Sequence, residues 1–387
     1  MYRQFAALKS ELPLLVTWNR LNEDQFALTG TDVQIVPEQF GQQIRGWQRR
    51  IDTMLRPRVG GDRFGRRFDR WLQQKLIDAK IDGVIGQFGN VAMTAETACN
   101  PIGIPTFAHF HGFDITARLR KHRYRKAITA HWHDFAGIIC VAGYQRDWLL
   151  QHGYDSEAVA LIPCGAPTRE IQQKTDALRS GRPPQTSQRA GECRFLFIGR
   201  FVDKKDPLSL LKAFGRCFRS QPHSRLRIAG FGPLESACRE WIDAQPNQLR
   251  SAISMLDTLS PQQVLEQFVE ADVYVQHSRL ASNGDKEGWP VVIAEAMAAG
   301  LPVVSTRHAG IIDQVVEEQT GYLSEEADWQ AMGDNMARIA ADPSARKAMG
   351  IASQQRMIQF DSATQVQRMR EFVGQRIDQV NFVRKAA

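Results

Sequence analysis

The chain of 387 residues is longer than one hydrophobic core usually supports, so we expect two domains. Apolar residues make up 43% and charged residues 24%, which is typical of globular proteins and excludes a disordered or fibrous chain. The formal net charge of +7 suggests an anionic partner, such as a phosphate ligand, a membrane surface or nucleic acid.

The cysteines indicate a reducing compartment. All 6 are spread along the chain without a CxxC pair, several of them within apolar runs, so we expect buried free thiols rather than disulfides or a zinc site. No run approaches the roughly 18 apolar residues of a membrane span, and the first residues lack the layout of a signal peptide. We therefore expect a cytoplasmic protein.

Short β-branched runs alternate with amphipathic segments along the whole chain. The expected strands of the first half are 12–16, 33–36, 83–86, 105–110, 137–142 and 158–162. Those of the second half are 194–199, 225–230, 252–256, 273–276 and 301–305. Residues 62–80 form an expected helix with Phe64, Phe68, Trp71, Leu72 and Leu76 on one face. Such alternation predicts parallel sheets covered by helices on both faces.

A polar segment rich in Pro, Gly, Ser and Gln divides the chain. We expect a first Rossmann-like domain at 1–165, a linker at 166–192 and a second domain at 193–358. Residues 359–387 are expected to form a helix that packs back toward the first domain. Two doubly wound, Rossmann-like α/β domains would then face each other across a cleft.

Two glutamates flank the start of one expected helix. Pro290 suits the first turn and Gly300 the end, so the helix is expected over 290–299. Glu287 precedes this helix, and Glu295 lies just over one turn inside it. Amide groups at a helix start bind phosphate and carboxylates accept from diols, which together indicate a nucleotide sugar. The alternative is a helix-dipole partner at Glu287 and a solvated Glu295.

The stretch EGWPVVIAEAMAAGLPVVST resembles the Glu-x7-Glu donor signature of the retaining GT-B glycosyltransferases of family 4. The flanking SNGDKEG and TRHAG are similar to the exopolysaccharide and colanic-acid branch in particular. The resemblance implies the GT-B fold, with Glu295 on the ribose hydroxyls and Glu287 near the donor sugar. It also implies that the amides of Gly288 and Trp289 reach sugar hydroxyls and phosphate.

The stretch FLFIGRFVDKKDP independently indicates a phosphate site. A strand ends at Gly199, Arg200 follows, and Lys205 lies just before a helix. Ligands bind at strand carboxyl ends in doubly wound sheets, and a diphosphate requires neutralising charge. The resemblance assigns Arg200 and Lys205 to this role. Asp206 stands where the family usually has glycine, which leaves Lys204 as a lesser candidate. Taken alone, the cations would be solvated loop residues.

In the first half, PTFAHFHGFDI predicts a buried strand that breaks at Gly112 and leaves His111 on the cleft. The resemblance implies that His111 lies against the donor sugar and the reacting centre. His109 faces the same side of the strand and is the fallback, while Asp114 is carried over only weakly. A structural, hydrogen-bonding histidine is the alternative for His111.

Further features belong to the resemblance. It implies that the loop at Gly230 flanks the nucleotide and that Leu259 lines the base, and Asp313 ends a loop that family members end with glutamate. The chain has no Asp-x-Asp triplet of the kind that metal-dependent transferases use, so we expect no catalytic metal and no cofactor. The family usually begins with a strand, whereas residues 2–12 predict a helix, so we expect either a late start or a missing strand.

We therefore expect a retaining glycosyltransferase of hexosyltransferase type, which moves a sugar from a nucleoside diphosphate to a hydroxyl of a lipid-linked glycan in surface polysaccharide synthesis. In a front-face transfer, the leaving phosphate oxygen would take the acceptor's proton. Two alternatives stay open: another GT-B enzyme such as a nucleotide-sugar epimerase, or a basic protein that binds nucleic acid or polysaccharide. The intact donor residues argue against the second, so no nucleic acid partner is expected.

Basic residues concentrate in the N-terminal half. Ten lie between Gly41 and Lys75 against three acidic ones, and six more lie between Arg118 and Lys126. Each basic residue near an anionic membrane contributes about 1 kcal/mol of attraction. We therefore expect peripheral membrane association through the N-terminal domain. A solvated basic face on ordinary helices is the alternative.

Overall fold

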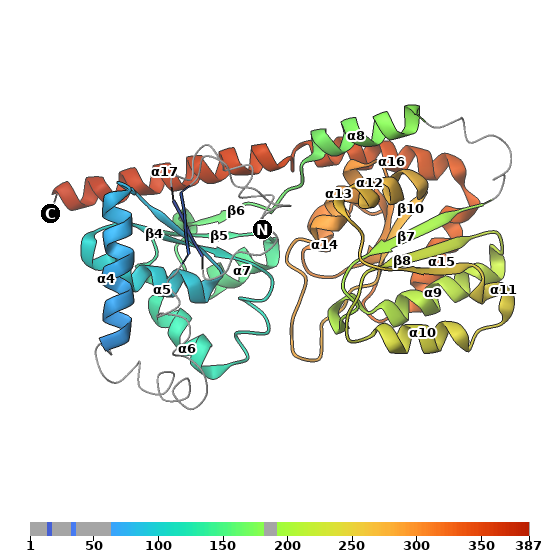
Figure 1. Cartoon of the computed structure of the whole chain (residues 1–387), viewed down its shortest axis with the longest axis horizontal. Coiled ribbons are helices and arrows are strands. Elements are labelled where there is room, and N and C mark those ends of the chain that lie inside the picture. Colours follow the sequence, from blue (N-terminus) through green and yellow to red (C-terminus); the bar gives the residue numbers. More distant parts are fainter. Residues whose placement is uncertain (1–13, 18–31, 36–62, 182–191, 387) are drawn as a thin grey trace.

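The structure, a computed structural model, describes residues 14–17, 32–35, 63–181 and 192–386. They form two lobes side by side, each with a sheet and covering helices (Figure 1). The expected helix at 2–12 and the basic residues at 45–58 lie outside the described residues. Within the described part of the chain, no helix has both the length and the apolar character that a membrane crossing requires.

The N-terminal lobe is built on a four-stranded parallel sheet in the order β3-β4-β5-β6. Its strands are β3 (Val84–Gln87), β4 (Thr106–Phe110), β5 (Gly137–Cys140) and β6 (Val159–Leu161). Its helices are α4 (Arg63–Asp78), α5 (Gly89–Cys99), α6 (His122–His131) and α7 (Gly143–Gln151), with short turns η1 (Asn100–Ile102), η2 (Trp132–Asp134) and η3 (Ser156–Ala158). Strands β1 (Leu14–Thr17) and β2 (Asp32–Ile35) pair in parallel as a separate sheet. The strands expected in this half are thus confirmed.

Helix α4 shows why the 3.6-residue period predicted it correctly. Phe68, Leu72 and Leu76 are buried against the end of α5, and Trp71 packs beside them. The side chain of Phe64 lies outside the described residues. The remaining face of the helix is polar, which leaves it in contact with solvent.

The C-terminal lobe contains a six-stranded parallel sheet in the order β12-β11-β10-β7-β8-β9. Its strands are β7 (Arg194–Ile198), β8 (Arg225–Ala229), β9 (Ile253–Leu256), β10 (Val273–Gln276), β11 (Val303–Thr306) and β12 (Gly321–Ser324). Its helices are α9 (Pro207–Ser220), α10 (Glu235–Asp243), α11 (Asn247–Arg250), α12 (Pro261–Glu270), α13 (Val291–Ala298), α14 (Ile311–Gln314), α15 (Trp329–Ala341) and α16 (Pro343–Ile358), with η4 (Asp203–Lys205) after β7. The strand order reverses between β7 and β10, as in a doubly wound nucleotide-binding fold.

Alternate residues of β7 point into two separate cores. Phe195 and Phe197 belong to the layer under α9 and α15, whereas Leu196 packs on the other face with Ile293 and Met297 of α13. Because both faces of β7 are covered, its residues Phe195 to Ile198 form a continuous apolar run in the sequence. All six cysteines are buried free thiols, as expected.

The expected linker at 166–192 needs correction, because it contains the helix α8 (Thr168–Ser180). Ile171 and Thr175 bury one face of α8, and the helix packs on α12 and α13 of the C-terminal lobe. Arg179 also donates to the carbonyl of Ala299 at 2.6 Å. The polar composition concealed this helix, since only a narrow stripe of it is buried.

The chain crosses between the lobes twice, and the crossings lie side by side. Ala166 bridges to Asp361, and the Thr168 hydroxyl donates to the Asp361 carboxylate at 2.7 Å. Helix α17 (Ser362–Ala386) then runs back along the N-terminal lobe (Figure 1). Its Phe372 ring lies 6.3 Å from that of Phe107 in β4. The last helix therefore covers the sheet of the first lobe.

Candidate active site

The charged residues predicted in the C-terminal lobe gather where the strand order reverses. Arg200 and Lys205 follow β7, and Glu287 follows the neighbouring strand β10. Because loops leave the carboxyl ends of these two strands toward opposite sides, the sheet opens into a crevice there. This crevice is the usual ligand position in doubly wound sheets.

Lys205 and Glu287 form a buried ion pair at this point. The Lys205 Nζ lies 3.0 Å from the Glu287 Oε1, and the side chains are only 11% and 7% exposed. Burial lowers the pKa of Lys205, although the charge of Glu287 opposes that effect. For Glu287, burial alone would raise the pKa, but the charges of Lys205 and Lys204 outweigh it and hold the pKa below its usual value. Glu287 is therefore ionised at neutral pH.

Further ion pairs tie the loop after β7 to the loop after β10. The Lys204 Nζ lies 3.0 Å from the Asp285 Oδ2, and the Arg279 guanidinium lies 2.6 Å from the Asp203 Oδ1. Arg200 differs, because its side chain is exposed and no ion pair joins it to a described residue. Of the cations in the loop after β7, Arg200 is therefore the one with an uncommitted charge in the described structure.

Asp206 accounts for the departure from the glycine of the family pattern. Its backbone is left-handed, with φ of 34°, a conformation that glycine adopts without cost and that Asp tolerates better than most residues. The Asp206 carboxylate accepts from the amide of Ser209 and so caps α9. Its other oxygen lies 3.2 Å from the Arg279 Nε. Where the family pattern has a glycine, this chain thus has an aspartate that adopts a left-handed backbone and caps α9.

A histidine and a glutamate that the sequence did not reveal hold the backbone of Glu287. The Glu287 amide donates to the His308 Nε2 at 3.1 Å, so the proton of His308 resides on Nδ1. From there it is donated to the Glu326 Oε1 at 2.6 Å, and the second carboxylate oxygen of Glu326 accepts from the amide of Leu280. The His308 side chain is fully buried. This chain of hydrogen bonds fixes the loop that carries Glu287.

The second glutamate of the pair lies on α13, which begins after Pro290 as expected. Glu295 is 8% exposed and so is not the solvated residue of the alternative interpretation. The Trp289 ring packs at the junction of the lobes, with Val141 nearby and Phe360 at 4.8 Å. The Trp289 ring is therefore used in packing. A ligand would contact the backbone at Gly288 and Trp289 rather than the indole.

His111 leaves β4 of the N-terminal lobe opposite the Glu287 loop. A Cβ on Gly112 would lie 2.6 Å from both the Gly288 nitrogen and the Lys286 oxygen, so the two lobes touch backbone to backbone here. The His111 Nε2 lies 3.0 Å from the Gln87 Oε1, and burial lowers the pKa of His111 to about 4. The imidazole is therefore neutral at physiological pH.

Asp114 and His109 support this turn rather than face the crevice. The Asp114 carboxylate accepts from the amides of His111 and Gly89, at 2.9 and 3.0 Å, and thereby joins the end of β4 to the start of α5. His109 is fully buried, and its ring lies 4.6 Å from the His111 ring. Burial also lowers the pKa of His109 far below its usual value, so the fallback residue is a packing partner of His111.

Of the remaining predicted residues, Gly230 and Leu259 follow strands, and Asp313 lies in α14. Gly230 follows β8 with φ of 135°, and a Cβ there would meet the Gly199 carbonyl at 2.0 Å, so the two loops pack closely. Leu259 follows β9 and is half-buried. Asp313 reaches across to the other lobe, where its carboxylate accepts from the amide of Gly143 at 2.8 Å and caps α7. The structure thus gives Asp313 an interlobe contact.

Comparison with known proteins identifies both lobes. Residues 27–170 match the family described as Glycosyltransferase Family 4, and residues 183–356 match the family described as Glycosyl transferases group 1. The chain carries two domains of the GT-B type. The predicted fold, two doubly wound domains of the GT-B type, is therefore confirmed.

Relatives of this chain include proteins named for polysaccharide synthesis. It is 27% identical over 239 residues to the amylovoran biosynthesis glycosyltransferase AmsK of Erwinia amylovora, a match that covers 60% of this chain and 54% of AmsK. It is 26% identical over 264 residues to WcaL of Escherichia coli K12, provisionally named as a colanic acid biosynthesis glycosyltransferase. This match covers 67% of this chain and 62% of WcaL. The chain thus spans between 54% and 62% of the length of these two relatives.

Solved structures agree with the fold of this chain. Anabaena HepE in complex with UDP has a TM-score of 0.72 at 16% identity, with 97% of this chain and 96% of HepE covered. The lipopolysaccharide outer core galactosyltransferase WaaB has a TM-score of 0.66 at 14% identity, with 97% and 94% covered. These identities are low, so the likeness concerns the arrangement of the two lobes.

Proposed function

We propose that the chain transfers a sugar, with retention of anomeric configuration, from a nucleoside diphosphate to a hydroxyl of a glycan acceptor. The observation that carries this proposal is the convergence at the strand reversal. Lys205 pairs with Glu287 there, Arg200 follows the same strand as Lys205, and the turn that holds His111 touches the Glu287 loop from the other lobe. A donor in this crevice would contact both lobes at once.

The two cations after β7 would bind the donor diphosphate. Arg200 has an exposed guanidinium, whereas Lys205 is buried and already held against Glu287. As the sugar leaves, negative charge grows on the phosphate, and fixed cations stabilise that charge more than they stabilise the bound donor. We therefore assign transition-state stabilisation to Arg200 and Lys205, without a metal step.

The other donor contacts follow from the loops around the crevice. Glu295 would accept from the ribose hydroxyls, and the amides of Gly288 and Trp289 would donate to the sugar and phosphate oxygens. The packed loops at Gly199 and Gly230, together with Leu259, would flank the nucleoside. Each of these groups lies at the carboxyl end of the C-terminal sheet.

For the reaction itself we propose a front-face transfer. The bond from the anomeric carbon to the phosphate oxygen breaks, and a bond to the acceptor oxygen forms on the same face. The acceptor's proton passes to the leaving phosphate oxygen, so no free carboxylate base is needed. Neutral His111 would contact the donor sugar beside the reacting carbon, and Glu287 would contact the sugar from the other lobe.

The names of AmsK and WcaL support an acceptor in surface polysaccharide synthesis. We propose that this acceptor is lipid-linked and is reached at an anionic membrane. Four exposed basic residues at the start of α6 favour such a surface, namely Lys121, Arg123, Arg125 and Lys126. Co-sedimentation with anionic vesicles at low salt, and release at high salt, tests this part. Absence of binding at low salt would contradict it.

The proposed function is tested in two steps. Thermal unfolding is first measured with a panel of UDP- and GDP-sugars, because a ligand at 100-fold its dissociation constant stabilises by about 2.7 kcal/mol. The stabilising donor is then incubated with glycan acceptors, and the new linkage is assigned by NMR. A product with the donor's anomeric configuration supports the proposal. An inverted product, or conversion of the donor sugar without an acceptor, would contradict it.

A further inference from the structure

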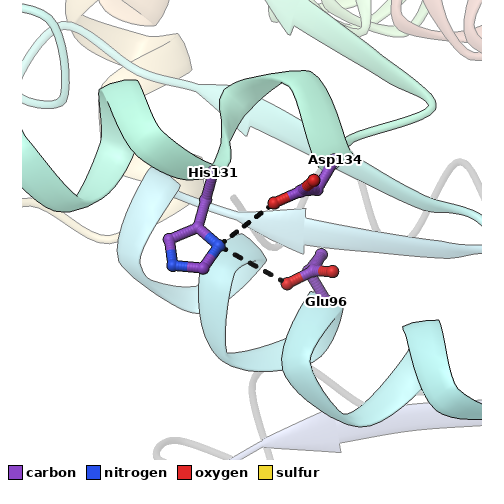
Figure 2. Close-up of side chains that lie close together, drawn as sticks. All are labelled: Glu96, His131 and Asp134. Carbon is purple, nitrogen blue, oxygen red and sulfur yellow. Dashed lines mark hydrogen bonds and ion pairs between the residues drawn. The ribbon is translucent and has the colours of Figure 1, made fainter. Parts of the chain in front are cut away.

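Three side chains point toward one another at the outer end of the N-terminal lobe. Figure 2 shows His131, from the end of α6, between Glu96 of α5 and Asp134 of η2. The His131 Nδ1 lies 3.2 Å from the Asp134 Oδ2 and 3.8 Å from the Glu96 Oε2. One ligand atom from each of the three residues lies within 4.8 Å of the other two.

This cluster lies far from the crevice. Helix α5 starts at the carboxyl edge of the sheet, where Gly89 contacts Asp114, and ends at the amino edge, where Glu96 lies. Thr106 begins β4 at that edge, whereas His111 follows β4 at the other edge. Five residues of strand separate the two, which corresponds to about 16 Å. The cluster therefore belongs to neither the donor nor the reacting centre.

A cavity of about 240 Å³ opens beside the cluster and is lined by Glu96, Asp134 and Thr106. The Thr106 side chain is buried, and its Oγ1 has no hydrogen-bond partner. Arg376 of α17 lines the same cavity but donates to the Ala136 carbonyl and to Gln379. The cavity therefore holds a buried hydroxyl that the described protein atoms leave unsatisfied.

Glu96 is the group that most needs a cation. The residue is only 5% exposed, and its neighbour within ion-pair range in the described chain is His131 at 3.8 Å. Two carboxylates that share a half-buried position repel each other unless positive charge lies between them.

We propose that Glu96, His131 and Asp134 bind one divalent transition metal ion such as Zn²⁺ or Co²⁺. Imidazole nitrogen favours these ions over Mg²⁺, and two carboxylates suit their charge. Zinc bonds to nitrogen and oxygen of about 2.0 to 2.1 Å place tetrahedral ligand atoms about 3.4 Å apart. The separations of 3.2 and 3.8 Å from His131 are close to this value. Water in the cavity would complete the shell.

The ion would link α5 to the turn between α6 and η2, at a place where no covalent bond joins them. His131 and Asp134 are about half exposed, so their side chains can move by the fraction of an ångström that binding requires. The competing interpretation is a protonated His131 that pairs with the two carboxylates and excludes metal. Both interpretations predict a stable cluster, and only the first predicts uptake of an ion.

The test is calorimetric titration of the full chain with ZnCl₂ and CoCl₂, after treatment with EDTA and desalting, and without nucleotide. We expect one ion per chain, a dissociation constant in the micromolar range or below, and a rise in Tm. His131→Ala and Glu96→Gln should each weaken binding at least tenfold, because each removes one ligand atom. His122→Ala, at the exposed start of the same helix, is the matched control and should bind like the wild type.

Three results would overturn the site. The wild type fails to bind Zn²⁺ and Co²⁺, both ligand variants bind like the wild type, or Mg²⁺ binds as tightly as Zn²⁺. Bound Co²⁺ gives a second readout, since its visible absorption reports nitrogen and oxygen ligation and should disappear in His131→Ala. Neither readout uses donor turnover, so the outcome is independent of the proposed reaction.

Discussion

The Lys205 Nζ lies 3.0 Å from the Glu287 Oε1, in a position where both side chains are almost fully enclosed. Lys205 comes from the loop after β7 and Glu287 from the loop after β10, so the pair joins the two strands between which the sheet reverses. A buried ion pair contributes less to stability than its separation suggests, because both charges lose water. We attribute its position to donor binding.

The diphosphate cations are predicted to matter for turnover. Arg200→Ala should reduce kcat/KM by about a hundredfold, because a charge-assisted contact that strengthens in the transition state contributes on the order of 2 to 4 kcal/mol. Steady-state kinetics with the identified donor measure this. Arg200 is exposed, so its variant should unfold at the wild-type temperature.

Lys205→Ala should lose activity as well, but it also leaves Glu287 buried without its partner, which costs about 3 kcal/mol of stability or more. The double variant Lys205→Met with Glu287→Gln separates the effects, since it restores packing without charge. Wild-type kinetics in Arg200→Ala, or full activity in the double variant, would contradict the diphosphate assignment.

The hydrogen bonds from Glu326 through His308 to the Glu287 amide predict a positioning role. His308→Ala should lower kcat by roughly tenfold, which corresponds to about 1.4 kcal/mol, because the Glu287 amide loses its buried acceptor. Affinity for the nucleoside diphosphate should stay near the wild-type value, since Arg200 and Lys205 are untouched. Equal losses in kcat and in nucleotide affinity would indicate general damage to the loop instead.

The left-handed backbone at Asp206 predicts an unusual order of stability. Asp206→Ala loses the cap on α9, which costs about 1 kcal/mol, and places alanine in a conformation that costs about 1 to 2 kcal/mol more. Asp206→Gly also loses the cap but removes the strain, so it should stay within about 1 kcal/mol of the wild type. Urea unfolding of both variants provides the measurement. A glycine variant less stable than the alanine variant would refute this explanation of Asp206.

The reaction is predicted to need no metal at the donor. Treatment with EDTA should leave kcat/KM within about twofold of its initial value, because Arg200 and Lys205 supply the positive charge. The same assay on Glu96→Gln excludes an indirect effect of an ion at the distal cluster. An absolute requirement for Mn²⁺ or Mg²⁺ that titration restores would show that these cations are insufficient.

The expected strands and α13 could be predicted because each is a short apolar run whose period is visible locally. Strand β12 was missed, since it starts at a glycine, Gly321, and contains little that distinguishes it from a turn. Helix α8 was missed because its buried face consists of only a few residues, so its sequence shows little apolar periodicity. Local patterns thus predicted elements with a clear apolar run or stripe, such as α4, and missed elements in which that signal is short or sparse.

The site shows a similar division. The resemblance assigned Lys205 and Glu287 to one donor site, whereas the ion pair between them was not predicted. His308 and Glu326 are 18 residues apart in the sequence, and Glu96 and His131 are 35 residues apart. Neither separation belongs to a recognisable sequence motif. Such contacts depend on how whole helices pack, which a single sequence does not encode in any short motif.

The central claim is that this crevice binds a nucleoside diphosphate through Arg200 and Lys205. Calorimetric titration with the matching nucleoside diphosphate and monophosphate, in the wild type and in Arg200→Ala, tests it most directly. The wild type should bind the diphosphate at least tenfold more tightly than the monophosphate, and Arg200→Ala should lose most of that difference, because the second phosphate then lacks its guanidinium. Equal affinities in the wild type, or a preference that survives in Arg200→Ala, would contradict the account.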